Sequence, residues 1–272
     1  MNYRHAYHAG NFADLVKHAA LLEVLARMDR PLTVVDTHAG AGRYDMAGPE
    51  ALRSGEAAAG VGRLMAAQTP PAPLAALARA VRDANAGADT RFYPGSPWLV
   101  AQALRPGDRL LAFELRGEEQ ATLARLLKAR PDVEVRCADG FAELARVPVK
   151  GPALALIDPP YERADDYGRA AQAAAAWLGR GPAAAAMIWT PLKDLETFDG
   201  FLRDLARACP GAPLLVAETR LRALDDPMRM NGCALVFVRP PGGLVPALEA
   251  ICGWAAARLG EAGAEARIWT PA

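Results

Sequence analysis

The residues of this sequence with the clearest potential for chemistry stand in the tetrapeptide Asp158-Pro159-Pro160-Tyr161. It directly follows Leu154–Ile157, a short apolar run of the kind that fills a buried strand. Asp158 offers a hydrogen-bond acceptor, the prolines leave their carbonyls as acceptors without a donor, and Tyr161 offers a flat aromatic face. Two acceptors beside a π-surface suit the exocyclic amino group of a nucleobase. A plain strand-ending turn would also explain the two prolines.

This tetrapeptide resembles the signature of methyltransferases that act on the N6 of adenine or the N4 of cytosine. By that resemblance, the Asp158 carboxylate and the Pro159 carbonyl accept the amino N–H groups, and Tyr161 stacks on the base. We expect Asp158 to work mainly by positioning and electrostatics, because a carboxylate is a weak base. Orientation would supply much of the acceleration, with near-attack contacts of about 3–3.5 Å.

A second candidate site segment follows the apolar run at 32–36. Residues 37–44 contain two glycines, which favour close backbone approach or positive φ at the end of a strand. Open α/β sheets bind ligands at such strand ends. Asp45 stands where a dinucleotide-binding fingerprint would have its third glycine. The segment instead looks like the first motif of S-adenosylmethionine enzymes, with His38 where an aromatic residue is often found.

Two further strand ends carry acidic residues that suit an adenosine-like cofactor. Glu114 ends the strand expected at 109–114 and suits the ribose hydroxyls. Asp139 and Gly140 follow the strand expected at 133–137, where an acceptor could bind the cofactor's adenine amino group. The order of these motifs predicts an α/β fold, that of a Rossmann-like class I methyltransferase dependent on S-adenosyl-L-methionine. Taken singly, each acidic residue could be an ordinary turn former.

The spacing of the motifs indicates an insertion. Glu114 comes far later than the roughly 20 residues that usually separate it from the glycine turn. Residues 46–91 fill the gap, are rich in alanine, leucine and arginine, and have a proline break at 70–73. We predict a small helical insertion subdomain at 46–91 within a main domain of residues 1–45 and 92–272. Ser96 is expected to cap a short helix there, on a loop that could reach the cofactor.

The remaining elements follow from periodicity and turn residues. Asn11 is expected to cap a helix at 12–28, close to Asp14 in the helix's first turn. Further helices are predicted at 117–129, after Lys193 to about 208, and at about 244–258. Further strands are predicted at 183–189, 213–219, 233–238 and 266–269.

Composition suits one large α/β domain or a domain with an insertion, since 52% of the 272 residues are hydrophobic and 23% are charged. The formal net charge of zero leaves a nucleic-acid partner open, because a local basic patch is enough. The four cysteines form no C-x-x-C motif and suit a reducing compartment. No cysteine joins the four histidines, so we expect no metal site. No apolar leader or bilayer-length run is visible, so we expect a cytoplasmic protein without a membrane partner.

A closer resemblance covers nearly the whole chain. It rests on Tyr3-Arg4-His5, Tyr7–Asn11, Lys17-His18, Asp36–Tyr44, Arg53–Glu56, Tyr93–Pro97, Ala138–Phe141 and Asp158–Tyr161. Together these segments resemble the RlmJ family, whose members methylate N6 of one adenine, adenine 2030, in 23S ribosomal RNA. The sequence departs from that pattern at Phe12, where histidine is expected, and at Ser54, where threonine is expected.

The resemblance implies a role for each matching residue. S-adenosyl-L-methionine would be the cofactor and S-adenosyl-L-homocysteine the product. Asp158 would be the catalytic residue, and Tyr3 would approach the target base. The cofactor contacts, with Gly40 added from the glycine turn, would be His18, His38, Gly40, Ser96, Glu114, Asp139, Gly140 and Asp158. Packing of the first helix would also explain His18, and helix capping alone would explain Ser96.

The partner implied by the resemblance is 23S ribosomal RNA, naked or early in assembly, bound by a monomer. Two other functions stay open. A DNA adenine-N6 methyltransferase shares the tetrapeptide, although it usually carries a dedicated duplex-reading domain. A non-catalytic RNA-binding protein could use S-adenosyl-L-methionine as a structural ligand, although the intact Asp158–Tyr161 segment speaks against it.

Overall fold

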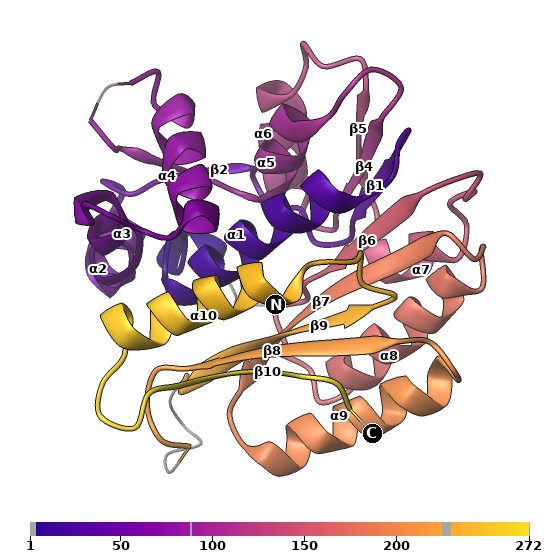
Figure 1. Ribbon diagram of the computed structural model, residues 1–272. Helices are drawn as coiled ribbons and strands as arrows, with labels where there is room; N and C mark the ends of the chain where they lie inside the picture. The colour runs from indigo at the N-terminus through magenta and orange to yellow at the C-terminus, as the bar shows by residue number, and fades with distance from the viewer. Residues whose placement is uncertain (1–3, 88, 225–229, 272) are drawn as a thin grey trace.

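The computed structural model describes residues 4–87, 89–224 and 230–271 (Figure 1). Its centre is an eight-stranded sheet in the order β10-β8-β9-β7-β6-β1-β4-β5. The five strands from β5 to β7 pair in parallel, and β9, β8 and β10 add an antiparallel half. The bounds are β1 Thr33–Asp36, β4 Arg109–Glu114, β5 Val133–Cys137, β6 Ala153–Ile157, β7 Ala184–Leu192, β8 Leu214–Arg220, β9 Gly232–Val238 and β10 Glu265–Trp269. The predicted α/β class is confirmed.

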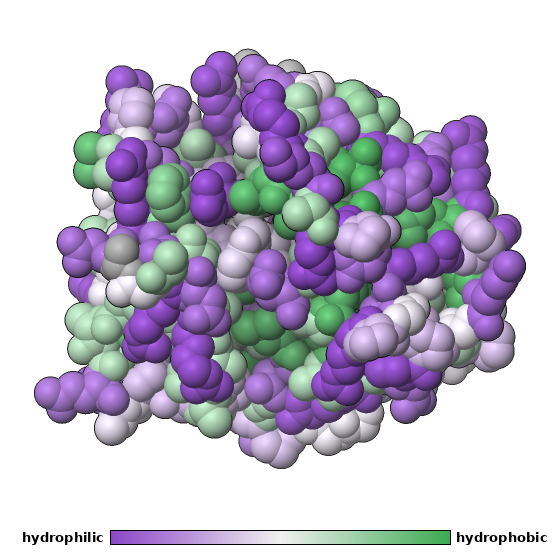
Figure 2. Space-filling view, turned by 90° about the horizontal axis from the view of Figure 1, so that it is seen from above, coloured by the Kyte–Doolittle hydropathy of each residue, from purple (hydrophilic) through white to green (hydrophobic). Residues whose placement is uncertain are grey.

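Helices cover both faces of this sheet, so the molecule has three layers. In Figure 1, α1 and α10 lie above the antiparallel half, and α8 and α9 lie below it. One apolar core contains residues of α1 Phe12–Arg27, α4 Ala72–Ala84, α5 Ser96–Ala103, α6 Gly117–Leu126 and α10 Val245–Leu259. The opposite core contains residues of α7 Gly140–Leu144, α8 Asp166–Leu178 and α9 Leu195–Ala208. From above, hydrophilic side chains cover most of the surface, with smaller hydrophobic patches between them (Figure 2). None of the helices in the described ranges is long and apolar enough to cross a bilayer.

The local predictions hold at most element ends. Asn11 caps α1, because its side chain accepts a hydrogen bond from the Asp14 N–H. The prediction that Ser96 caps a helix is wrong. Gly95 is the N-cap of α5, and Ser96 is the first helical residue. The Ser96 hydroxyl instead donates to Asp36 Oδ2 at 2.7 Å, because α5 begins directly beside the end of β1.

The described part of the segment 46–91 contains several helices, as predicted. It contains α2 Pro49–Ser54, a π-helix η2 Ala58–Gly62, α3 Arg63–Ala66 and α4. Two short antiparallel strands, β2 Arg43–Asp45 and β3 Phe92–Pro94, hold its two ends together. The sequence did not predict this pair, since 93–97 reads as a turn. Buried residues of α4 join the core of α1, so the segment packs against the first helix.

The parallel half of the sheet brings the predicted motifs to one edge. β1 pairs with both β6 and β4, and β5 lies beside β4. The carboxyl ends of these strands lead into Asp158, Thr37, Glu114 and Asp139. The turns pack closely, because a Cβ added at Gly140 would lie 2.1 Å from the Thr37 carbonyl oxygen. Gly140 is therefore required where two site loops touch.

Candidate active site

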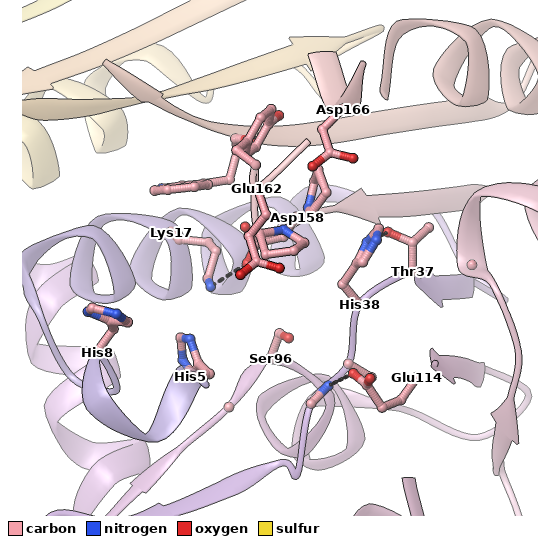
Figure 3. A pocket seen from close by; sticks show the side chains of 18 of the residues that line it. His5, His8, Lys17, Thr37, His38, Ser96, Glu114, Asp158, Glu162 and Asp166 are labelled. Atoms are coloured by element: carbon pink, nitrogen blue, oxygen red, sulfur yellow. Dashed lines mark hydrogen bonds and ion pairs between the residues drawn. The ribbon is translucent and has the colours of Figure 1, made fainter. Parts of the chain in front are cut away.

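A cavity of about 1080 Å³ opens at this edge of the sheet (Figure 3). Its volume suits a ligand of cofactor size. Every predicted site residue that the structure describes lines it: His18, His38, Gly40, Ser96, Glu114, Asp139, Gly140, Asp158, Pro159 and Tyr161. Tyr3 lies outside the described residues, so its predicted approach to the base stays a prediction.

One end of the cavity is built around Glu114. Its Oε2 accepts the Gly40 N–H at 2.9 Å, and its Oε1 accepts the Arg116 N–H at 2.8 Å. Gly40 has φ of +62°, and a Cβ there would lie 2.1 Å from the Tyr44 hydroxyl oxygen. Glycine is thus needed for the turn that orients Glu114. The arrangement gives a buried carboxylate fixed by backbone donors, with further lone pairs for a diol.

Asp139 lies at the same end of the cavity. Its Oδ1 accepts the Phe141 N–H at 3.0 Å, which makes it the N-cap of α7, and its Oδ2 accepts from Arg169 at 2.8 Å. His38 packs edge-on against the Phe141 ring, with 4.8 Å between centroids. Burial lowers the pKa of His38 to about 4, so the ring is neutral at pH 7. This end of the cavity therefore combines two carboxylates with an uncharged aromatic wall.

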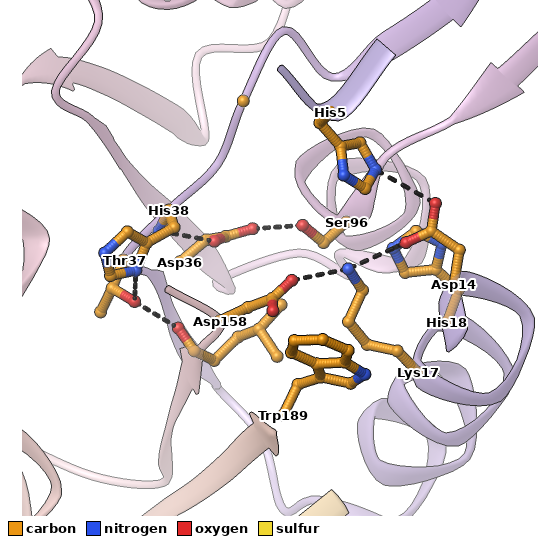
Figure 4. A network of polar contacts seen from close by, with 12 residues as sticks. His5, Asp14, Lys17, His18, Asp36, Thr37, His38, Ser96, Asp158 and Trp189 are labelled. Atoms are coloured by element: carbon orange, nitrogen blue, oxygen red, sulfur yellow. Dashed lines mark hydrogen bonds and ion pairs between the residues drawn. The ribbon is translucent and has the colours of Figure 1, made fainter. Parts of the chain in front are cut away.

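The other end contains Asp158, at the end of β6. Asp158 Oδ2 accepts a hydrogen bond from Lys17 Nζ at 2.6 Å, and Lys17 Nζ also lies 3.0 Å from Asp14 Oδ1 (Figure 4). The Lys17 side chain is only 7% exposed. Burial works against its charge, but the carboxylates of Asp14 and Asp158 raise the pKa of Lys17 well above its usual value. A fixed cation therefore orients the Asp158 carboxylate.

Tyr161 is more deeply packed than its predicted stacking role suggests. It is 8% exposed, and its hydroxyl donates to the Trp189 carbonyl oxygen at 2.7 Å. Its ring lies against Tyr167 and Trp189, with centroid distances of 4.5 and 5.9 Å. Its φ of +50° is unusual for a residue with a side chain and shows that the loop after the prolines turns sharply. Stacking of Tyr161 on a base stays a prediction.

His18 and Ser96 join a buried polar layer behind the cavity wall. His18 Nδ1 is 2.9 Å from the Tyr93 hydroxyl, while its Nε2 is buried with no hydrogen-bond partner in the described structure. Burial lowers the pKa of His18 to about 3. Ser96 bonds to Asp36, whose pKa is raised to about 7, mainly by burial and further by the nearby Asp158. The His18 Nε2 atom is therefore one that a ligand in the cavity could still satisfy.

Sequence reasoning missed the roles of Asp14, Lys17 and Asp36. The spacing of Asp14, Lys17 and His18 is i, i+3 and i+4, which places all three on one helix face. That face is buried, and polar residues on a buried helix face are the signal that could have revealed the ion pair. Its partner Asp158 is 141 residues away, a distance no local pattern bridges.

Within the described ranges, no group of three or more histidine, cysteine, aspartate or glutamate side chains is arranged to hold a metal ion. The carboxylates of Glu114, Asp139 and Asp158 each accept hydrogen bonds from backbone N–H groups or side-chain cations. Such a set is suited to hydrogen-bonding an organic ligand.

Comparison with known proteins agrees with this geometry. Residues 29–271 match the family model described as "Ribosomal RNA large subunit methyltransferase D, RlmJ". The chain is 32% identical to the ribosomal RNA large subunit methyltransferase J of Escherichia coli (strain K12), over 97% of this chain and 95% of that one. It is 31% identical to the protein of that name from Haemophilus influenzae, over 89% and 88%.

A solved structure shares the fold over nearly its full length. A crystal structure of a Legionella pneumophila protein superposes with a TM-score of 0.88 at 26% identity, covering 97% of this chain and 98% of that one. The predicted Rossmann-like class I methyltransferase fold is confirmed. With the family model matching residues 29–271 and two full-length relatives above 30% identity, the chain belongs to the RlmJ family of ribosomal RNA large subunit methyltransferases.

Proposed function

We propose that this protein transfers a methyl group from S-adenosyl-L-methionine to N6 of an adenine in 23S ribosomal RNA. The observation that carries the proposal is the cavity itself, which brings Glu114 and Asp139 at one end together with Asp158 at the other. Family membership supplies the class of reaction and RNA. The Asp158–Tyr161 segment supplies the preference for an amino group.

The residues at the Glu114 end fit S-adenosyl-L-methionine. Glu114 is oriented by two backbone N–H groups and can accept from a ribose diol. Asp139 can accept from an adenine amino group, and the buried His18 Nε2 needs a partner that a cofactor could provide. S-adenosyl-L-methionine supplies an electrophilic methyl group when bound, and S-adenosyl-L-homocysteine is the product. We call this half of the cavity the cofactor end.

The Asp158 half, here called the base end, suits an amino group. The adenine N6 lone pair is delocalised into the ring and is a poor nucleophile. Hydrogen bonds from its N–H groups to the Asp158 carboxylate and the Pro159 carbonyl would favour a tetrahedral nitrogen with the lone pair directed at the methyl donor. Lys17 fixes the Asp158 carboxylate for this purpose. Asp158 is then placed to accept the proton that the amino group loses.

The finer features of the substrate complex belong to the same proposal. The target is adenine 2030 of 23S ribosomal RNA, naked or early in assembly, and the enzyme is a cytoplasmic monomer. The adenine must leave its stack, at a cost of a few kcal/mol. Tyr3 approaches it, and Tyr161 provides the ring surface at the base end. Residues 46–91 form an insertion subdomain within the domain of residues 1–45 and 92–272.

Methyl incorporation separates this function from its alternatives. The purified protein should transfer tritiated methyl groups to transcribed 23S ribosomal RNA and not to duplex DNA. N6-methyladenine mapping should show one site lost in a strain without the gene. Incorporation into duplex DNA alone would favour the DNA enzyme. Cofactor binding without turnover on any RNA would favour the non-catalytic function.

Replacement of the catalytic carboxylate is the sharpest single-residue test. Asp158→Ala should lower turnover by roughly 10²- to 10⁴-fold, the range typical of a positioned acid–base group. Affinity for S-adenosyl-L-methionine, measured by calorimetry, should fall much less. An Asp158→Ala enzyme with normal turnover would refute the assigned role.

A further inference from the structure

The turn before the first helix reaches into the cavity. The 3₁₀ turn η1 His5–Tyr7 carries His5, which lines the cavity and lies beside Tyr44 with 4.7 Å between ring centroids. His5 Nε2 is 3.1 Å from Asp14 Oδ2. The backbone N–H of Gly10 also donates to Asp14 Oδ2, at 2.9 Å. The position of this turn is therefore coupled to Asp14.

Asp14 connects the turn to the base end. Its other oxygen lies 3.0 Å from Lys17 Nζ, which donates to Asp158 at 2.6 Å. Figure 4 shows His5, Asp14, Lys17 and Asp158 in one continuous series of contacts. A shift of the turn would therefore move an acceptor that Lys17 shares with Asp158. This makes the support of the turn important for the chemistry.

The support comes from the segment 46–91, through the side chain of Glu56. Both Glu56 oxygens lie within hydrogen-bond distance of His8 Nδ1, at 3.0 and 3.1 Å. Glu56 Oε2 also accepts from Asn11 Nδ2 at 2.9 Å. Asn11 is the cap of α1, so Glu56 reaches both sides of the turn that joins η1 to the helix. The Glu56 hydrogen bond and charge raise the pKa of His8, because the carboxylate stabilises the protonated ring.

A backbone contact fixes the same turn independently. Gly60 belongs to the π-helix η2, and the Val61 N–H donates to the Gly10 carbonyl oxygen at 2.8 Å. A Cβ added at Gly60 would lie 2.1 Å from that oxygen and 2.9 Å from the Asn11 carbonyl carbon. Both atoms are backbone, so no side-chain movement could relieve the overlap. Short π-helical segments are often found at functional sites, and this one is shaped by contact with the turn.

We propose that the segment 46–91 is the platform that positions the N-terminal turn over the active site, with Glu56 as its principal positioning residue. The inference rests on the proposed methyltransferase function and adds to it a role for the insertion. Glu56 acts through His8 and Asn11, which hold the turn that carries His5. Substrate geometry is thus set by a residue that is far from Asp158 in the sequence and touches none of the reacting atoms.

Substitution of Glu56 tests the proposal. Glu56→Ala should lower kcat on 23S ribosomal RNA by roughly 10- to 100-fold, since small misplacements of site groups have effects of this size. The Kd for S-adenosyl-L-methionine should stay within about twofold, because the cofactor end keeps all its contacts. Glu56→Gln retains an acceptor oxygen and should lose less than Glu56→Ala. Amide hydrogen exchange over residues 7–11 should become faster in Glu56→Ala.

Glu50→Ala is the matched control. Glu50 lies in α2 of the same segment, and the described structure gives its side chain no hydrogen bond or ion pair. The Glu50→Ala variant should have the kcat of wild type and the same rate of amide hydrogen exchange over residues 7–11. His8→Ala should lower kcat less than Glu56→Ala does, because Glu56 then keeps its hydrogen bond to Asn11. Adding His8→Ala to Glu56→Ala should have little further effect, because Glu56→Ala already removes the His8 contact. Additive losses, or normal kcat and exchange in Glu56→Ala, would overturn the proposal.

Gly60→Ala provides a second variant at an independent contact. It should accelerate exchange over residues 7–11 and lower kcat, again with cofactor affinity retained. Unchanged exchange in a folded Gly60→Ala protein would contradict the platform role. The wild-type enzyme separates this proposal from the proposed function. If wild type does not methylate 23S ribosomal RNA, the function fails, whereas active wild type with unaffected Glu56 and Gly60 variants refutes only the platform.

Discussion

The two ends of the cavity hold their carboxylates by different means. At the cofactor end, Glu114 accepts backbone N–H groups of Gly40 and Arg116. At the base end, Asp158 depends on the side chain of Lys17, which comes from another part of the chain. Backbone donors come with the turn itself, and among side-chain replacements only proline would delete one. A side-chain cation can be removed by one substitution, so the base end should be the more fragile half.

The largest effect should follow from removing that cation. Lys17→Met removes the cation that Asp14 and Asp158 share, and loss of one partner of a buried ion pair costs about 3–5 kcal/mol. Urea unfolding should report this loss. Turnover should fall with it, while the Kd for S-adenosyl-L-methionine of the folded enzyme should change little.

The control for Lys17→Met is Lys128→Met, at an exposed lysine beyond the end of α6. Its unfolding free energy should match that of wild type. If Lys17→Met is as stable as Lys128→Met, the ion pair does not support the base end and the contrast between the two ends is lost.

Glu114→Gln tests the cofactor end, as Lys17→Met tests the base end. Hydrogen bonds to a charged group are worth about 1.5–3 kcal/mol, so KM for S-adenosyl-L-methionine should rise roughly 10- to 100-fold. With saturating cofactor, kcat should stay near wild type. Glu134→Gln, at an exposed residue of β5, should change neither constant. A fall in kcat with unchanged KM would show that the two ends are not separable.

Asp36 lies behind the cavity, where burial and the nearby Asp158 carboxylate raise the pKa of Asp36, and it should make stability depend on pH. Its folded pKa is about 7, above its ordinary value of 3.8, so the folded protein retains a proton there that the unfolded chain releases. This contribution is fully present below pH 3.8 and is lost as pH rises through about 7. Asp36→Asn should therefore lose less stability than wild type between those pH values. Unfolding free energies can be measured by urea titration at several pH values. If those of wild type and Asp36→Asn change equally with pH across this range, Asp36 is not the source of the pH dependence.

The smallest effect is expected at Tyr161. Tyr161→Phe removes the hydroxyl that donates to the Trp189 carbonyl and should cost about 0.5–1.5 kcal/mol in unfolding free energy. Tyr167→Phe, whose hydroxyl lies 3.4 Å from the Pro191 carbonyl oxygen, is the paired comparison and should cost less. An equal loss of unfolding free energy in both variants would show that the shorter hydrogen bond of Tyr161 stabilises the protein no more than the longer one of Tyr167.

The difference between local backbone contacts and long-range side-chain contacts also explains which features the sequence could predict. Strand periodicity and turn residues identified Gly40, Glu114, Asp139 and Asp158, which line one cavity, because each is encoded beside its own strand. Most of the sheet and the helices between residues 46 and 91 followed from the same local signals. The capping role given to Ser96 was wrong, because Gly95 is the N-cap of α5 and Ser96, the first helical residue, donates its hydroxyl to Asp36.

Features that depend on long-range contacts were not predicted. The Lys17–Asp158 pair and the β2–β3 clamp join segments with no common pattern. Glu56 was visible only as part of a family resemblance, because its partners His8 and Asn11 come from a different part of the chain. Local sequence patterns carry information about turns, whereas contacts between turns need the folded backbone.

Lys17 and Asp158 are in contact but lie 141 residues apart in the sequence, and this affects the order in which the site forms during synthesis. A nascent chain emerges N-terminal end first, so α1 is synthesised long before β6, which must insert beside β1. Until that strand arrives, Lys17 has Asp14 as its acidic neighbour and the Asp158 carboxylate does not yet exist. The ion pair that orients Asp158 can thus form only after more than half of the polypeptide has been made.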